Sequence, residues 1–236
     1  MIGLGTLVNV AAIAAGGIIG LAFGKMLPER VQKGLLMACG VCVLFLGMEG
    51  ALAKALVPAG GKLQAEGTLM TVLSFAVGTL AGEILDIERA VERFGEWLKR
   101  KTGNAGDGGF IGAFVSSSLT VCIGAMAIVG SIADGIQGDP SILFVKAILD
   151  FVIIMVMSAA LGRGCVFSAV PVALLQFSVT FLAVLAGPLF TPRALDNLSL
   201  VGSMIIFCVG VNLVWSARIR VANMLPALLA ALLWPW

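Results

Sequence analysis

The chain has 236 residues, of which 60% are hydrophobic and only 12% are charged, and its mean hydropathy is +1.09. A soluble domain carries about 25% charged residues, so this composition excludes a soluble globular protein and indicates several helices embedded in lipid. The net charge is +2, and no basic block is interleaved with aromatic residues, which excludes a nucleic-acid partner.

Eight apolar runs follow one another along the chain, at residues 2–23, 34–57, 67–87, 110–133, 142–161, 165–189, 198–217 and 221–236. A spanning helix needs about 20 apolar residues, so the last run is barely long enough. We expect an all-α polytopic membrane protein of about 7–8 transmembrane helices, folded as one domain over residues 1–236. The alternative to an eighth span is a re-entrant or interfacial tail. No basic residue precedes Lys25, so the first run is expected to be a retained helix and not a secretory signal.

The longest connection between runs contains an amphipathic segment. Its apolar residues recur at helical spacing, and the segment carries five cationic residues, namely Arg89, Arg93, Lys99, Arg100 and Lys101. This pattern predicts a helix over residues 87–101 that lies on the membrane surface and faces anionic headgroups. The helix would serve as a cytoplasmic anchor or, alternatively, as a docking site for a partner.

Lysine and arginine concentrate on one side of the predicted spans. Short cytoplasmic loops carry the excess of these residues. With the N-terminus outside, eleven of them fall on the inner side and three on the outer side, the three being Lys54, Lys62 and Arg193. We therefore expect the N-terminus to lie outside.

Two stretches of the chain resemble each other helix by helix. The matched positions pair Gly16, Gly20, Cys42 and Gly50 with Gly78, Gly82, Cys122 and Gly130. We interpret residues 2–57 and 67–133 as two copies of a helical hairpin in the same orientation. Small residues four apart allow close helix packing, either within the chain or in a homodimer.

Ionisable residues inside the spans are the most informative, because a charge at the bilayer centre costs several kcal/mol unless it is paired or faces water. Lys146 and Asp150 are four residues apart on one helix face and can form a structural pair. Glu49 lacks such a neighbour, and its depth matches that of Asp150. An unpaired carboxylate at this depth predicts a shared polar site.

Neutral polar residues at the same depth would complete this site, although each can also bond two helices together. The candidate substrate- or ion-binding residues are Asn9, Glu49, Ser117, Thr120, Lys146, Asp150 and Gln176. Asp134 and Asp139 are instead expected to be turn residues.

Enzymatic chemistry finds little support in the sequence. Histidine is absent, which removes the commonest general base and metal ligand. The five cysteines lie in apolar runs, where a thiol behaves as a small hydrophobic group. No glycine-rich phosphate loop is present. We therefore expect no enzyme, no cofactor, no metal and no ATP-driven pump.

Several motifs carry a family resemblance. The stretch CIGAMAIVGSIADG at residues 122–135, the KAILD at 146–150 and the closing RVANMLP at 220–226 resemble the YqgA/YdfK-like bacterial membrane proteins, domain-of-unknown-function family 554. The resemblance implies a polytopic inner-membrane protein, usually labelled a transporter, with no agreed substrate. If these motifs mark a functional site, the resemblance implies that its residues are Asn9, Gly124, Asp134, Lys146, Asp150 and Gln176.

These observations favour a secondary transporter or channel for a small solute or ion across the bacterial inner membrane. Asp150 would bind a coupling cation, such as sodium or a proton, beside Lys146. The expected partners are the lipid bilayer and the small solute or cation. The alternative is a non-transporting membrane scaffold or sensor that uses the basic surface helix.

Overall fold

The computed structural model describes the whole chain apart from residues 1, 25, 27, 60, 102, 104, 105, 123, 124, 137, 187–190, 216–218, 235 and 236. Lys25, Gly124 and Arg218, which the sequence analysis used, lie outside the described residues.

The described part consists of helices and one short hairpin. The first half contains α1 (Leu4–Gly24), α2 (Glu29–Ala55), β1 (Leu56–Ala59), β2 (Lys62–Ala65), α3 (Thr68–Leu85), α4 (Ile87–Lys101), α5 (Phe110–Cys122) and α6 (Ala125–Ile136). The second half contains α7 (Ser141–Leu161), the 3-10 helix η1 (Arg163–Ser168), α8 (Ala169–Ala186), α9 (Pro192–Trp215), the 3-10 helix η3 (Val221–Met224) and α10 (Pro226–Leu232).

The expected all-α polytopic membrane architecture is confirmed. Among the described residues, six helices are long and apolar enough to cross a membrane: α1, α2, α3, α7, α8 together with η1, and α9. The expected span at 110–133 is broken, because α5 and α6 meet at a bend of 72° and qualify only as a pair. The last apolar run forms the short helix Val221–Leu232, so the structure favours the tail over an eighth span.

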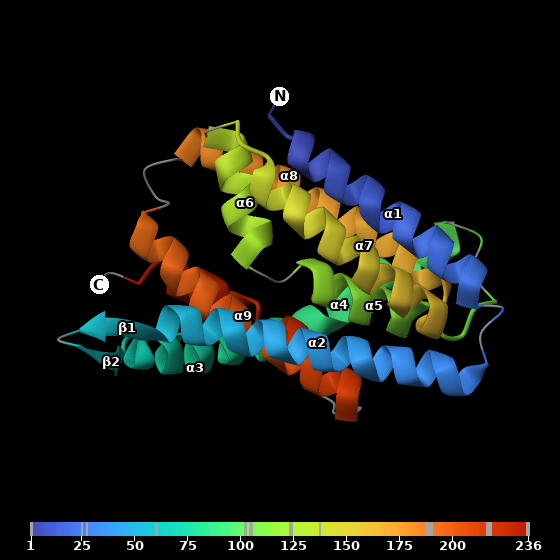
Figure 1. Cartoon of the computed structure of the whole chain (residues 1–236), viewed down its shortest axis with the longest axis horizontal. Coiled ribbons are helices and arrows are strands. Elements are labelled where there is room, and N and C mark those ends of the chain that lie inside the picture. The colour runs from blue at the N-terminus through green and yellow to red at the C-terminus, as the bar shows by residue number, and fades with distance from the viewer. Residues whose placement is uncertain are drawn as a thin grey trace.

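The helices pack in two groups (Figure 1). In one group α1 lies along α7 and also contacts α8 and η1. In the other group α2 lies along α9, and α3 packs against α10, η3 and α9. The bent pair contacts both groups, since α5 and α6 each touch α7, α8 and α9. The break between α5 and α6 therefore lies where the two groups meet.

Glycines allow α1 to approach α7 closely. A methyl group added at Gly16 or Gly20 would collide with the backbone carbonyl oxygens of Phe151 and Met155, respectively. Because both sets of residue numbers rise together, α1 and α7 run in the same direction. The small face predicted on α1 is thus covered within the chain, and a homodimer would need another surface.

The packing of α2 against α9 is antiparallel, since Gly40 meets Leu213 and Gly47 meets Phe207. The directions constrain the path of the chain. Successive membrane crossings alternate in direction. If each of the six long helices crosses the membrane, α7 can therefore run parallel to α1 only when the bent pair crosses the membrane between α3 and α7. The structure therefore fits seven crossings better than six.

The proposed hairpin repeat stays a prediction. Cys42 and Gly50 both lie in α2, which is one continuous helix, whereas Cys122 ends α5 and Gly130 lies beyond the bend in α6.

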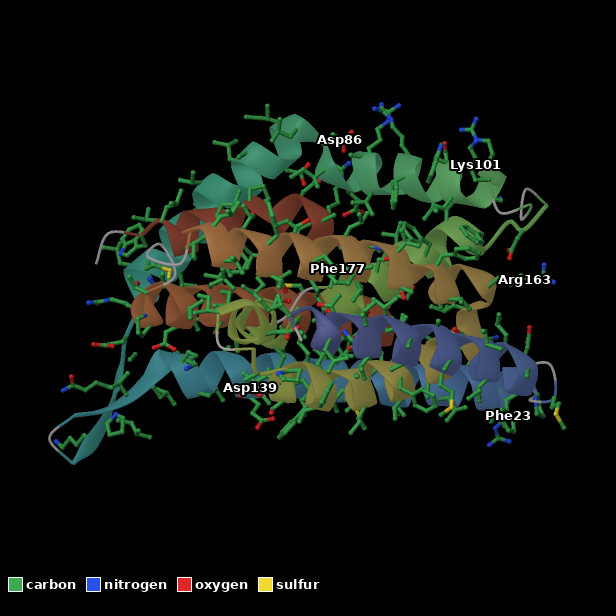
Figure 2. All side chains as sticks on the ribbon, turned by 90° about the horizontal axis from the view of Figure 1, so that it is seen from above. Phe23, Asp86, Lys101, Asp139, Arg163 and Phe177 are labelled. Carbon is green, nitrogen blue, oxygen red and sulfur yellow. The ribbon has the colours of Figure 1, made fainter. Side chains whose placement is uncertain are left out.

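A helix is present over residues 87–101 as α4, whereas its predicted position on the membrane surface stays a prediction. Its buried residues are Gly95 and Leu98, and Leu98 clusters with Phe110 and Phe114 of α5. The helix runs along the length of the molecule between Asp86 and Lys101 (Figure 2). Part of its apolar face packs on α5, whereas Trp97 is 51% exposed.

The two ends of the molecule differ in charge. Phe23 lies at one end together with Lys101 and Arg163, two of the cationic residues that we assigned to the inner side (Figure 2). The opposite end carries the antiparallel hairpin β1–β2, which pairs Leu56 with Ala65 and turns at Gly61.

Candidate functional site

The predicted pair on α7 is present and buried. The Lys146 ammonium donates hydrogen bonds of 2.9 and 2.7 Å to the two carboxylate oxygens of Asp150. The exposed fractions are 6% for Lys146 and 3% for Asp150. Helical spacing alone brings the two side chains together, and burial makes the pair costly to separate because each charge would lose its only strong compensation.

Lys146 also ties this pair to the broken helix. Its ammonium donates a third bond, of 2.8 Å, to the backbone carbonyl oxygen of Val121 in the last turn of α5. The carbonyls at the C-terminal end of a helix have no partner within that helix, and they attract cations. A discontinuous helix whose end meets a buried charge is the arrangement by which many transporters build ion and substrate sites.

A cavity of about 340 Å³, here called the Asp150 cavity, opens beside the pair. Its walls come from α2, α5, α6, α7 and α9, so it lies where the two groups and the bent pair meet. The polar lining residues are Glu49, Thr120, Lys146, Asp150 and Ser203. Four of the seven residues predicted from sequence therefore share one cavity, although they come from three separate helices.

The charges around the Asp150 cavity leave an excess of one negative charge. Lys146 and Asp150 compensate each other, whereas Glu49 is an exposed side chain on α2. The remaining walls are mainly apolar. The cavity is therefore suited to a small cation or to a solute that carries one cationic group.

Asn9 supports the pair from α1. Its side chain is fully buried and faces Asp150, yet neither polar atom of the amide has a partner in hydrogen-bond geometry. Buried amides are normally bonded, so Asn9 has unused donor and acceptor capacity directly beside the carboxylate.

Three predicted residues do not line the Asp150 cavity, namely Asn9, Ser117 and Gln176. Ser117 is buried, but its hydroxyl donates to carbonyl oxygens of its own helix, those of Ala113 and Phe114, at 2.7 and 3.2 Å. Gln176 on α8 is also buried, and both atoms of its amide lack a partner. Thr120 lines the cavity while its hydroxyl donates to the Ser116 carbonyl oxygen.

The expectation that Asp134 is a turn residue is wrong. Asp134 lies within α6 and is fully buried, and its carboxylate accepts a 3.2 Å hydrogen bond from the Gly5 backbone N–H in the first turn of α1. A carboxylate at a helix N-terminus is stabilised by the helix dipole. Asp139 does lie in a turn, where it accepts from the Ser141 backbone N–H at 3.0 Å.

Ser203 is the lining residue that the sequence analysis missed. It lies on α9 and is buried beside Gly50. The sequence gives little indication of a role for Ser203, because a serine in an apolar run is as often a helix-packing residue as a ligand.

A comparison with protein families shows which family the chain belongs to. The model of a family described as "Protein of unknown function (DUF554)" matches residues 4–236. The chain belongs to the DUF554 family.

Two relatives cover almost the whole chain. The uncharacterized protein YqgA of Escherichia coli (strain K12) is 29% identical over 233 residues, which is 97% of this chain and 94% of YqgA. The uncharacterized membrane protein YdfK of Bacillus subtilis (strain 168) is 25% identical over 226 residues, which is 95% of this chain and 92% of YdfK. No solved structure matches the chain. Membership in the DUF554 family thus agrees with a membrane protein and names no substrate.

Proposed function

We propose that this DUF554 protein is a secondary transporter or channel for a small solute or ion, and that the Asp150 cavity is its binding site. The observation that carries the proposal is the buried Lys146–Asp150 pair, which borders a cavity and bonds the free end of a broken helix. Buried ionisable residues that face a cavity inside a membrane are typical of ion and substrate pathways.

Each group has a role in this proposal. Asp150 binds the cation or proton, and Lys146 compensates Asp150 when the site is empty. Glu49 and Ser203 contact the solute from α2 and α9. Asn9 supplies the amide that can move onto Asp150 when its bond to Lys146 weakens. We place the protein in the bacterial inner membrane with its N-terminus outside, on the basis of its lysine and arginine distribution.

The proposal is tested by charge movement in proteoliposomes. Wild-type protein should respond to rapid steps of sodium, protons or one of a panel of small charged metabolites, and Asp150→Asn should abolish the response. Asp107→Asn makes the same chemical change in the α4–α5 connection, away from the cavity, and should leave the current unchanged. A folded Asp150→Asn variant with full activity would exclude this role.

A different function, that of a non-transporting scaffold or sensor, is favoured by the exposed face of α4. Arg93 and Lys101 are exposed there, and Trp97 is 51% exposed. This alternative expects that replacing Lys146 and Asp150 together by Leu and Asn is tolerated, whereas deleting residues 88–101 is damaging. Pull-down with and without α4 would show whether a partner depends on it. An enzymatic function is not proposed.

A further inference from the structure

A second cavity, here called the vestibule, lies against α4. It has a volume of about 460 Å³, and its polar lining residues are Glu88, Ser116, Asn212 and Arg220. Val115, Leu119 and Val209 contribute apolar walls. None of these residues lines the Asp150 cavity.

The two cavities follow each other along the same two helices. On α5 the vestibule is lined by Ser116 and the Asp150 cavity by Thr120, one turn further on. On α9 the corresponding residues are Val209 and Ile206. One helical turn is about 5.4 Å, and the Thr120 hydroxyl donates to the Ser116 carbonyl oxygen at 2.7 Å across this separation. The two cavities are therefore about one helical turn apart along α5 and α9.

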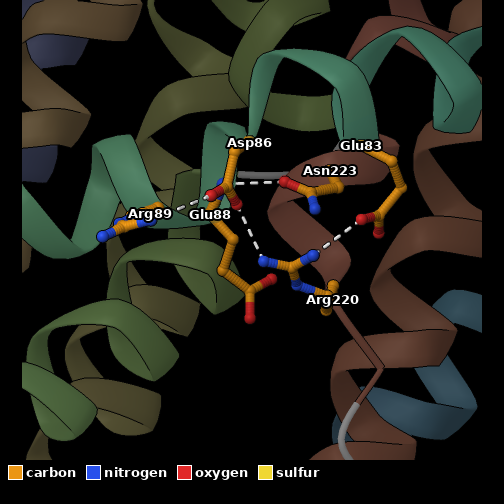
Figure 3. Close-up of polar contacts among 6 residues, drawn as sticks. All are labelled: Glu83, Asp86, Glu88, Arg89, Arg220 and Asn223. Atoms are coloured by element: carbon orange, nitrogen blue, oxygen red, sulfur yellow. Dashed lines mark hydrogen bonds and ion pairs between the residues drawn. The ribbon is translucent and has the colours of Figure 1, made fainter.

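The charge of Arg220 is compensated by two carboxylates (Figure 3). Its guanidinium donates to Glu83 at 2.6 Å and to Asp86 at 2.7 Å, and neither of these residues lines the vestibule. Asp86 is also 4.0 Å from Arg89. Around the vestibule, Glu83, Asp86 and Glu88 thus outnumber the two arginines by one negative charge.

Glu88 supplies that excess charge. Its backbone N–H donates a 2.8 Å hydrogen bond to the Asn223 side-chain oxygen, which fixes the start of α4. One oxygen of its carboxylate, Oε2, is buried and has no hydrogen-bond partner. A buried carboxylate oxygen without a partner costs free energy, and a cation bound in the vestibule would remove that cost.

We propose that the vestibule is a cation-binding station on the path to the Asp150 cavity, with the Glu88 carboxylate as the group that receives the cation. The inference rests on the proposed function, because it gives the transported or coupled species a positive charge and a route along α5 and α9. The lining of the Asp150 cavity carries one excess negative charge, and in the vestibule Glu83 and Asp86 engage Arg220 and leave the Glu88 carboxylate to attract a cation, so a cation would be favoured at each station.

Thiol labelling tests this inference without requiring transport. Ser116→Cys, Thr120→Cys and Ser118→Cys are made separately, and Ser118→Cys serves as the control because Ser118 lines a different, apolar cavity. The proteins are reconstituted in phosphatidylcholine nanodiscs and treated with cationic trimethylammonium-ethyl or anionic sulfonato-ethyl methanethiosulfonate. Peptide mass spectrometry measures labelling at each position separately, so the native cysteines can remain, and rates are normalised to those of a free cysteine peptide.

The thiol of the Ser116→Cys variant should prefer the cationic reagent by roughly tenfold, as expected for one unit charge nearby in a partly solvated cavity. Adding Glu88→Gln should reduce this preference to near unity. Glu92→Gln removes an exposed carboxylate from the same helix and should leave most of the preference intact. Equal preference in the Ser116→Cys and Ser118→Cys variants, or equal effects of the two glutamine substitutions, would overturn the assignment to Glu88.

The route is tested by blocking it. Adding Ser116→Trp to the Thr120→Cys variant should slow labelling of the thiol at position 120 by the cationic reagent, because the indole would fill the part of the vestibule one turn from position 120. An unchanged rate would show that the Asp150 cavity is reached another way and would overturn the path. Loss of the charge preference with intact Asp150-dependent flux rejects the vestibule alone, whereas absent flux with preserved labelling rejects the proposed transport alone.

Discussion

The Lys146 ammonium lies 2.8 Å from the Val121 carbonyl oxygen and 2.7 Å from a carboxylate oxygen of Asp150. One side chain therefore compensates both a buried acid on α7 and the free end of α5. Any event that changes the charge of Asp150, such as proton or cation binding, would alter how strongly Lys146 holds the broken helix. This coupling gives the proposed binding step a direct mechanical consequence.

Replacing one member of the Lys146–Asp150 pair should lower the free energy of unfolding more than replacing both members together. Lys146→Met and Asp150→Leu should each lower the free energy of unfolding by about 3–5 kcal/mol, because each leaves one buried charge without its partner. The double variant should be more stable than the sum of these losses predicts. Reversible unfolding in lipid bicelles by sodium dodecyl sulfate measures all four proteins. Additive losses would show that the two residues do not interact energetically.

Close packing of α1 on α7 predicts a contrast between two glycines. Gly20→Ala should destabilise the protein by about 1–3 kcal/mol, because the added methyl group meets the Met155 carbonyl oxygen. Gly34→Ala on α2 has open space around it and should be neutral or stabilise by up to about 1 kcal/mol through helix propensity. Thermal midpoints in one detergent compare the two. Similar effects would contradict the parallel contact between α1 and α7.

The environment of Glu88 predicts a pH dependence. Burial raises the pKa of Glu88 above its ordinary value of 4.5, and Glu92 and Glu83 act in the same direction, against the Ala222 backbone N–H and Arg220. A raised pKa in the folded state means that the stabilisation is full below pH 4.5 and is lost as the pH rises through the raised pKa. Glu88→Gln should therefore be more stable than wild type at neutral pH, and the difference should disappear in acid.

Thermal midpoints of wild type and Glu88→Gln across this range check the prediction. The preference of the Ser116→Cys thiol for the cationic reagent should fall as the pH is lowered over the same interval, since protonation of Glu88 removes the charge that attracts the reagent. A wild-type protein that gains stability relative to the Glu88→Gln variant as the pH rises would contradict the assigned direction.

The start of α4 should depend on Asn223. Asn223→Ala removes the acceptor of the Glu88 backbone N–H and should destabilise by about 1–3 kcal/mol, because a partly buried donor is left unpaired. Asn197→Ala removes a side-chain nitrogen that has no partner and should cost less. Amide hydrogen exchange at the first turn of α4 should increase only in the Asn223 variant. Equal exchange in both variants would mean that other contacts fix this turn.

Helical geometry explains which parts of the site could be predicted from the sequence. Lys146 and Asp150 are on the same helix, so their spacing determined their contact before any tertiary structure was known. Glu49 and Thr120 were assigned by depth, and both line the Asp150 cavity. Depth does not specify which way a side chain points around its helix, however. Ser117 has nearly the same depth as Thr120 but bonds to carbonyls of its own helix.

The break between α5 and α6 could not be predicted from helical spacing and hydropathy. Hydropathy measures the average composition of a window, and residues 110–133 are apolar on average despite their serines and Thr120. What a window cannot register is the contact that stabilises the free helix end at the break, namely Lys146 of α7 bonding to Val121. For the same reason, Glu88 and Arg220 could not be assigned to a site from the sequence, because the vestibule exists only once α4, α5 and α9 have assembled.

The parallel pairing of α1 with α7 has a consequence for biosynthesis. α1 is made first, yet the surface that its glycines fit is completed only when the ribosome has passed Leu161. Until then, the newly inserted helix presents its glycine face and Asn9 to lipid or to the insertion machinery. Assembly of the Asp150 cavity must therefore be a late event, and a nascent chain arrested before α7 should remain bound to that machinery.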